Sequence, residues 1–427
     1  MKNLHFPREK LEQALQAALT NEYSDFYRRH LSHIKDAQGN LTLSEWRALP
    51  LVRRDDVVSV PFWDRVHVPH EEVQYIRNTY GTSGKRILVT PRALYGSFEQ
   101  NPYDAQSVTS VINFIASAHN GFPRDVIKSD TQLFFGDVGH LAMSARIIRQ
   151  SKVDMLYILP YTALAIADYL DAEGVTQHIK VVQLCGERCS PLQFKKLKER
   201  YPNATVYGYY GQSETRELLS VACEHDRARG GSLIVEVLAP EFYMELVDTN
   251  TGEVVEEYGA YGEVVFTTLV PHVPFPLVRY ATGDIARYVK RDCSCEEKRP
   301  GFEIIGRGTS EPIRMVKGEL TLDAVENSLV DISAVSPEYF EVHYREQETD
   351  MNALPQVEIK VVAAGSTAPD MEIVRNTLEN TLRVFPTYTY ANGVRDGIYL
   401  PLSVSLLDAA PPSPAGKPKA PVIVRHT

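Results

Sequence analysis

The sequence has no long hydrophobic run. No stretch of its 427 residues approaches the roughly 18 consecutive apolar residues of a membrane-spanning helix. The N-terminal segment MKNLHFPREKLEQALQAAL also lacks the apolar core of a signal peptide. We therefore expect a cytoplasmic protein with no membrane partner.

The sequence also lacks an excess of positive charge. Its 45 Lys and Arg residues against 55 Asp and Glu residues give a net charge of -10 at pH 7. Because such a surface repels polyanions, nucleic acid is excluded as the main partner. A local cluster of cations can still hold a small anion such as a nucleotide.

Cysteine is scarce, with five residues in the whole chain. An odd number in a chain of this length does not indicate a disulfide framework. Four residues on either side of a β-rich span form a Cys-x-His and a Cys-x-Cys pair: Cys223, His225, Cys293 and Cys295. Three thiolates and one imidazole suit tetrahedral Zn²⁺, so the sequence predicts a structural zinc site, with unligated cysteines as the alternative.

Short β-rich runs alternate with helical stretches between residues 75 and 290. Val181–Leu184 is β-rich, and Pro191–Arg200 has helical spacing. This alternation predicts an α/β fold. After Gly306 the sequence becomes rich in glycine and charge. We therefore place a large N-terminal α/β domain at residues 1–306 and a smaller C-terminal α+β domain at residues 307–427.

A segment rich in small residues, YGTSGKR, occupies residues 80–86. Small residues let backbone N–H groups approach a phosphate, and a lysine neutralises it. The segment is not a Walker loop, because Thr79 and Arg86 stand where that motif needs Gly and Ser or Thr. The predicted phosphate-binding residues are Gly81, Thr82, Ser83, Gly84 and Lys85, and an ordinary surface loop is the alternative when the segment is taken alone.

Four further motifs follow along the chain in a fixed order. They are Tyr210 to Glu214, Arg279 to Asp284, Gly306-Arg307 and Gly416-Lys417. Each alone is common in turns, but the ordered set is specific. The set resembles the acyl-adenylate-forming (ANL) superfamily and, within it, the phenylacetate-CoA ligase branch. The resemblance covers nearly the whole chain and implies a mobile C-terminal domain.

Enzymes of this kind activate a carboxylic acid with ATP. The resemblance implies an acyl-AMP intermediate, release of pyrophosphate, and transfer of the acyl group to a thiol such as coenzyme A. It implies that Glu214 ligates Mg²⁺, that Asp284 accepts hydrogen bonds from the ribose hydroxyls, and that Lys417 is catalytic at the carboxylate and α-phosphate. The other implied nucleotide-binding residues are Gly186, Glu187, Tyr210, Gly211 and Arg307.

The expected acid-binding segment is LFFGDVGHL at residues 133–141. Phe134, Phe135 and Gly136 suit an aromatic acid, whereas Asp137 and His140 suit an amino or hydroxyl substituent. An aliphatic acid is the alternative for the substrate, and an ordinary strand core is the alternative for the two phenylalanines.

Gly306-Arg307-Gly308 resembles the hinge about which the C-terminal domain of such enzymes rotates. This sequence departs from the family pattern there, because residues 308–311 replace the usual Asp-containing sequence. This departure leaves three acceptors open: coenzyme A, the thiol of an acyl carrier protein, and an amine. A relative that binds nucleotide without catalysis is a further alternative. The resemblance also implies a homodimer.

Overall fold

The computed structural model describes most of the chain, and the statements below concern that part. The described residues are 7–31, 42–73, 77–78, 88–89, 108–115, 131–186, 189, 191–212, 214, 220–237, 241–249, 251–270, 273–290, 301–307, 313–348, 353–365, 368–385, 387–409 and 421–426.

A seven-stranded sheet forms the centre of the larger part of the molecule. Its strands are, in spatial order, β4 (Gln132–Phe135), β3 (Ser110–Asn113), β5 (Met155–Ile158), β6 (Val181–Leu184), β7 (Thr205–Tyr210), β8 (Ser220–Val221) and β9 (Glu236–Val237). The five strands from β4 to β7 are parallel, and β8 and β9 are antiparallel. Every residue of β3, β5 and β6 is buried, as expected of parallel strands covered on both faces.

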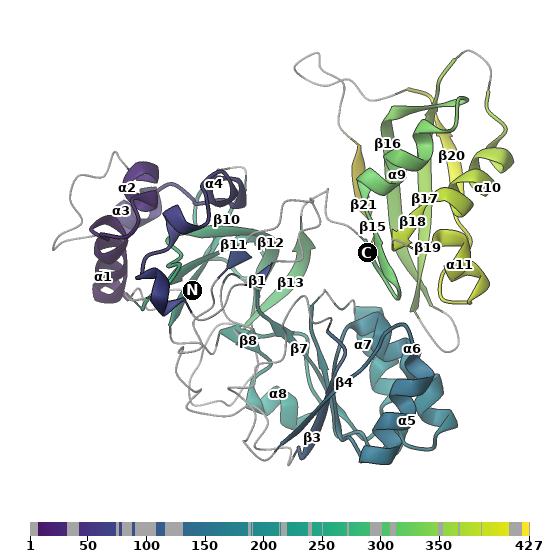
Figure 1. Ribbon diagram of the computed structural model, residues 1–427, viewed down its shortest axis with the longest axis horizontal. Helices are drawn as coiled ribbons and strands as arrows, with labels where there is room; N and C mark the ends of the chain where they lie inside the picture. The colour runs from purple at the N-terminus through teal and green to yellow at the C-terminus, as the bar shows by residue number, and fades with distance from the viewer. Residues whose placement is uncertain are drawn as a thin grey trace.

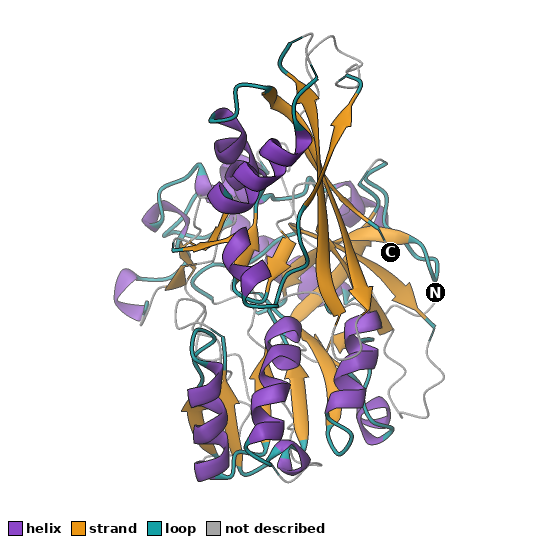
Figure 2. Ribbon diagram, turned by 90° about the vertical axis from the view of Figure 1, so that its right-hand side faces the viewer, coloured by secondary structure: helices purple, strands orange, loops and turns teal. Residues whose placement is uncertain are grey.

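Three helices cover one face of this sheet side by side (Figure 2). They are α5 (Leu141–Ser151), α6 (Pro160–Ala172) and α7 (Pro191–Arg200). Pro160 is the first residue of α6, a position at which a backbone N–H has no hydrogen-bond partner within the helix. The missing N–H of proline therefore removes no helical hydrogen bond. The apolar side chains of these helices and strands form one continuous core cluster. A short helix, α8 (Glu224–Ala228), follows β8.

A second, antiparallel sheet packs beside the N-terminal helices (Figure 1). Its strands are β10 (Phe242–Val247), β11 (Tyr261–Thr268), β12 (Tyr280–Val289) and β13 (Gly301–Arg307). The helices are α1 (Arg8–Leu19), α2 (Phe26–His30), α3 (Leu43–Ala48) and α4 (Arg54–Val58). Leu11, Leu15 and Ala18 are buried on α1, which confirms the amphipathic helix that their spacing predicts. β1 (Arg77–Asn78) pairs with β2 (Leu88–Val89).

The C-terminal part is built on a four-stranded sheet of its own (Figure 1). The sheet order is β20 (Ser403–Leu407), β17 (Ala353–Ala363), β16 (Val335–Glu348) and β21 (Val422–Arg425). Its helices are α9 (Leu322–Val330), α10 (Met371–Thr381) and α11 (Tyr390–Arg395), and two small hairpins are β14 (Ile313–Met315) with β15 (Gly318–Leu320) and β18 (Arg383–Phe385) with β19 (Tyr388–Thr389).

The predicted α/β fold is confirmed in its elements. Val181–Leu184 and Pro191–Arg200 form a strand and a helix with the predicted bounds. No helix in the described ranges is long and apolar enough to cross a membrane.

His67 is a buried histidine in the N-terminal core. Its ring packs against Tyr27 with 5.5 Å between ring centroids, and both ring nitrogens lack a hydrogen-bond partner within the described residues. Loss of hydration, with a smaller contribution from Arg28, lowers the pKa of His67 to about 4 from its ordinary 6.5. The folded protein therefore holds this imidazole neutral at neutral pH.

We predict that His67→Phe flattens the pH dependence of stability on the acid side. With a depressed folded pKa, the contribution of His67 is complete above pH 6.5 and is lost as the pH falls toward 4, because the unfolded chain takes up the proton first. The loss is on the order of 3 kcal/mol in the wild type. Urea unfolding at several pH values measures the slope, and the same slope in the variant would contradict the prediction. His178→Gln, at an exposed position, is the control.

Candidate active site

The carboxyl ends of the parallel strands meet at one edge of the seven-stranded sheet. In open α/β sheets this edge is where ligands bind. Gly136 and Asp137 follow β4, Gly186 lies two residues after β6, and Tyr210 and Gly211 stand at the end of β7. The topology therefore brings these sequence-predicted residues to one edge, although 75 residues separate the ends of β4 and β7 in the chain.

A buried hydrogen-bonded group lies at the end of β7. The Tyr210 hydroxyl donates to Asp284 Oδ2 at 2.7 Å, and Gln212 Nε2 donates to the same oxygen at 3.0 Å. Tyr210 and Asp284 are 8% and 7% exposed. Burial, followed by the adjacent Asp284 charge, raises the pKa of Tyr210 well above its ordinary value. The phenol therefore remains a donor, and Asp284 is oriented by two side chains from another strand end.

Glu214 and Arg307 belong to the same neighbourhood. The Tyr280 hydroxyl, at the start of β12, donates to Glu214 Oε1 at 3.5 Å. Asp284 on β12 is the register partner of Arg307 on β13, so the backbones of the two predicted residues lie opposite each other. Residues from three separate segments therefore converge at this place. Gln212 was not singled out from the sequence, although its place between Tyr210 and Glu214 was a usable signal.

The predicted acid-binding residues lie at the end of the edge strand β4. Phe134 packs against the helical core cluster, whereas Phe135 is 65% exposed within the described structure. The strand-core alternative is therefore wrong for Phe135. Gly136 is required sterically, because a Cβ there would lie 2.4 Å from the Phe114 ring.

Asp137 and His140 bind each other. His140 Nδ1 lies 2.8 Å from Asp137 Oδ2, and the Gly139 N–H donates to Asp137 Oδ1 at 2.7 Å. The hydrogen bond from His140, followed by that from Gly139, lowers the pKa of Asp137. This carboxylate is therefore charged at neutral pH, and its two hydrogen bonds fix the turn that begins α5.

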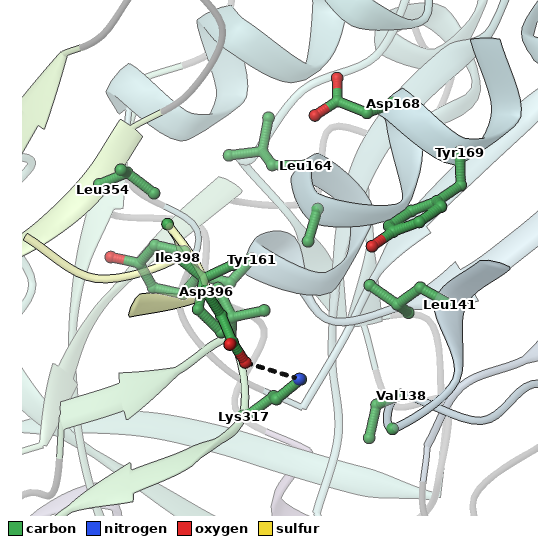
Figure 3. A pocket seen from close by; sticks show the side chains of 14 residues that line it. Val138, Leu141, Tyr161, Leu164, Asp168, Tyr169, Lys317, Leu354, Asp396 and Ile398 are labelled. Carbon is green, nitrogen blue, oxygen red and sulfur yellow. Dashed lines mark hydrogen bonds and ion pairs between the residues drawn. The ribbon is translucent and has the colours of Figure 1, made fainter. Parts of the chain in front are cut away.

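A cavity of about 470 Å³ lies between the helices of the large sheet and the C-terminal part of the chain (Figure 3). Its lining residues are Val138, Gly139, Leu141, Tyr161, Leu164, Ala165, Asp168, Tyr169, Val316, Lys317, Leu354, Asp396, Gly397 and Ile398. Sequence reasoning missed it, because its two walls come from segments that are more than 140 residues apart in the chain.

Lys317 and Asp396 form the polar pair on the C-terminal wall (Figure 3). Lys317 Nζ lies 3.5 Å from Asp396 Oδ2 and 4.9 Å from the centroid of the Tyr388 ring. The Tyr388 hydroxyl donates to Asp396 at 2.5 Å, and this bond, with Lys317 nearby, lowers the pKa of Asp396. Lys317 sits in the turn of the β14–β15 hairpin, and Gly318 has a φ of +103°. That turn packs so closely on Val384 that a Cβ at Gly318 would lie 1.9 Å from its carbonyl oxygen.

Several predicted site residues lie outside the described residues. They are Gly81, Thr82, Ser83, Gly84, Lys85, Glu187, Cys293, Cys295 and Lys417. Their roles stay predictions.

Only one half of the predicted zinc site lies in the described structure. Cys223 is buried, and its Sγ accepts from the Asp226 N–H at 3.4 Å, which caps α8. His225 follows on that helix, and its Nδ1 is buried with no hydrogen-bond partner among the described residues. Within the described ranges no three His, Cys, Asp or Glu side chains form a group that suits a metal. The lack of a partner for His225 Nδ1 among the described residues suits a role as a metal ligand. A bound zinc ion stays a prediction.

Comparison with known proteins first gives a match to a family model. Residues 109–268 match the family model described as AMP-binding enzyme. This range contains β3 to β9, which form the seven-stranded sheet, together with β10 and β11 of the second sheet. This part of the chain is therefore similar to AMP-binding enzymes.

The chain is also similar to two curated proteins named phenylacetate-coenzyme A ligase. It is 26% identical to phenylacetate-coenzyme A ligase of Thermus thermophilus over 96% of both chains. It is 27% identical to the Escherichia coli enzyme of the same name over 70% of this chain and 69% of that one. These matches confirm the resemblance that the ordered motifs predict.

Solved structures agree on the fold. A 2-hydroxyisobutyryl-CoA ligase, in complex with 2-HIB-AMP and CoA, matches with a TM-score of 0.67 at 18% identity, over 98% of this chain and 89% of that one. The amide bond synthetase McbA from Marinactinospora thermotolerans matches with a TM-score of 0.52 at 17% identity, over 87% and 74%. Both have the two-part architecture seen here.

Proposed function

We propose that this protein is an ATP-dependent carboxylic acid ligase that forms an acyl-AMP and transfers the acyl group to coenzyme A. The observation that carries the proposal is the buried group of Tyr210, Gln212 and Asp284 at the carboxyl edge of the sheet. Its position and chemistry suit the ribose of a nucleotide. The similarity to phenylacetate-coenzyme A ligases over most of the chain supports the same reaction.

Each residue then has a defined task. Asp284, held by two donors, accepts hydrogen bonds from the ribose hydroxyls, and Tyr210 and Gly211 line the adenine and acyl pocket. Glu214 would hold Mg²⁺, which would neutralise the phosphate oxygens. Gly81 to Lys85 bind the departing pyrophosphate. Lys417 stabilises the negative charge that develops at the α-phosphate when the carboxylate attacks.

We also propose an aromatic acid as the substrate. Phe135 is exposed beside Gly136 at the sheet edge that carries the nucleotide residues, whereas Phe134 packs into the core, and an aromatic ring packs well on an exposed phenylalanine. Asp137 and His140 already satisfy each other, so a polar substituent on the acid would have to exchange for an existing hydrogen bond. An unsubstituted aryl acid is therefore favoured over a hydroxylated one.

The cavity between the two parts of the chain is the proposed entry for the acceptor. Its volume of about 470 Å³ lies in the range of small-molecule sites. Lys317 supplies a cation to a coenzyme that carries phosphates, and Leu141, Leu164 and Ile398 supply an apolar wall to its pantetheine arm.

We place the domain boundary at residue 306, because the core cluster of the C-terminal part begins at Ile313.

Exchange of labelled pyrophosphate into ATP tests the first half-reaction. We expect exchange that requires Mg²⁺ and an aryl acid, and that does not require a thiol, because adenylation precedes transfer. A panel of aryl, hydroxyaryl, aminoaryl and fatty acids identifies the acid. Exchange with none of them, while ATP still binds, would overturn catalysis in favour of nucleotide binding alone. Product formation with coenzyme A, with a carrier protein, or with free amines then decides the acceptor.

We predict that Lys317→Ala raises the KM for coenzyme A about tenfold, because one charge-assisted contact with phosphate is lost. Pyrophosphate exchange is expected to stay unchanged. Lys198→Ala is a matched control, since Lys198 also lies over an aromatic ring, Phe194 at 5.7 Å, but outside the cavity. Equal KM values for both variants would remove Lys317 from the acceptor site.

A further inference from the structure

Tyr161 connects the two parts of the molecule. It lies in the first turn of α6, on the large sheet, and its side chain is 4% exposed. The core cluster that buries it is otherwise made of buried residues between Ile313 and Ile423. The hairpin of β16 and β17 extends toward α6 and α7, and β17 contacts α7 (Figure 1). One side chain of the N-terminal part is therefore packed into the core of the C-terminal part.

A hydrogen-bonded triad forms at this contact. The Tyr161 hydroxyl donates to Glu346 Oε1 at 3.1 Å, and the Tyr344 hydroxyl donates to the same oxygen at 3.0 Å. The two hydroxyls are also within hydrogen-bond distance of each other. All three groups are partly buried, where hydrogen bonds to a carboxylate are stronger than in water. Glu346 therefore ties a tyrosine of its own strand to a tyrosine of the other domain.

The triad and the acceptor cavity require the same domain orientation. Tyr161 lines the cavity, which is enclosed by residues of both parts of the chain. If the C-terminal domain rotates, Tyr344 and Glu346 move together on β16, whereas Tyr161 stays on α6. The cross-domain bonds and the two-walled cavity are then lost together. A contact present in only one of two states shifts the equilibrium toward that state by its free energy.

We propose that Tyr161, Tyr344 and Glu346 are positioning residues that hold the C-terminal domain in the orientation for acyl transfer. This inference rests on the proposed function, in which the cavity receives the acceptor. The hydrogen bonds of the triad join α6 to β16, whereas the Tyr210 group lies at the end of β7, so we expect adenylation to proceed without the triad. It sets the fraction of adenylate-loaded enzyme that can accept coenzyme A.

The test separates the two half-reactions in the full-length protein. Tyr161→Phe, Tyr344→Phe and Glu346→Gln are each expected to slow acyl-CoA formation about tenfold in kcat, the effect of losing one hydrogen bond to a carboxylate. Pyrophosphate exchange is expected to stay within about twofold of wild type. An equal loss in both half-reactions would indicate a purely structural role, and no loss in either would also overturn the proposal.

Tyr339→Phe is the matched control. Tyr339 lies on the same strand and donates to Glu341 Oε1 at 2.7 Å, the same Tyr-x-Glu spacing, and this hydrogen bond lies within β16. We expect wild-type transfer in this variant. If acyl transfer in Tyr339→Phe fell as much as in Tyr344→Phe, the effect would come from a change in β16 as a whole. That result would overturn the proposed role of the triad.

Small-angle X-ray scattering supplies a readout that needs no activity. The Tyr161→Phe/Glu346→Gln double variant is expected to show a changed pair-distance distribution, because the domains reorient, whereas Tyr339→Phe is not. If the wild type shows neither pyrophosphate exchange nor acyl transfer, the proposed function fails. Scattering still tests whether the triad holds the orientation of the C-terminal domain. An unchanged distribution in the double variant would overturn it.

Discussion

Replacement of Asp284 with alanine is expected to reduce pyrophosphate exchange by about 10²- to 10⁴-fold. The carboxylate is assigned two hydrogen bonds from the ribose, and each bond to a charged acceptor contributes about 1.5–3 kcal/mol. The variant also leaves the Tyr210 hydroxyl and the Gln212 amide without the oxygen that both contact. Exchange kinetics with saturating acid measure the effect on kcat/KM for ATP.

Asp284→Asn is the control for shape. It keeps an oxygen acceptor and the side-chain volume but removes the charge, so we expect a smaller loss than in Asp284→Ala. The thermal midpoint of each variant shows whether the fold is intact. Exchange within about threefold of wild type in a folded Asp284→Ala variant would contradict the assignment of the ribose to this carboxylate.

Replacement of Arg279 with methionine is expected to destabilise the protein by about 3–5 kcal/mol. Arg279 Nε lies 3.3 Å from Glu245 Oε2, and the two side chains are only 2% and 1% exposed. Trp46 Nε1 donates to the same oxygen at 3.0 Å. Burial raises the pKa of Glu245, an effect that Arg279 opposes. Without the guanidinium, a buried carboxylate remains without its ion-pair partner.

Arg279 also connects two distant segments. Its Nη1 donates to the carbonyl oxygens of Arg47 and Leu49 at 2.6 and 2.5 Å, which fastens the end of α3 to the start of β12. Its backbone has a φ of +44°, a conformation that is unfavourable for a residue with a side chain. The ion pair and these bonds maintain that strained conformation, so their loss affects the chain path as well as the charge.

Urea unfolding measures the change in the free energy of unfolding. Because a chain with several cores can unfold in steps, the midpoint of the first transition is compared. Arg287→Met is the control: Arg287 lies 2.8 Å from Glu303 on the same sheet, but the side chains are 38% and 20% exposed. Such a pair contributes less than about 1 kcal/mol. Equal midpoints for the two variants would contradict a role for the buried pair.

The motif from Arg279 to Asp284 shows what a sequence pattern can and cannot separate. The motif is continuous in the chain, yet its first residue is buried against Glu245 and Trp46, and its last faces Tyr210. The resemblance predicts that the motif matters. The structure gives Arg279 a role in stability and Asp284 a proposed role in binding because Arg279 directly precedes β12, whereas Asp284 lies within it. No local sequence pattern predicts this difference.

The sequence alone indicated the α/β fold class, the strand Val181–Leu184 and the helix Pro191–Arg200, and it singled out Tyr210, Glu214 and Asp284 as candidate residues. These depend on local periodicity and on short motifs, in which neighbouring residues carry the signal. Tertiary structure alone decided that Phe135 is exposed, that Asp137 and His140 pair, and that Lys317 faces α6 across a cavity. Tyr161 and Glu346 are 185 residues apart in the chain, and their contact depends on how two separately built cores pack together. Such a contact depends on the shapes of the two folded surfaces, and these shapes form only after each core has folded.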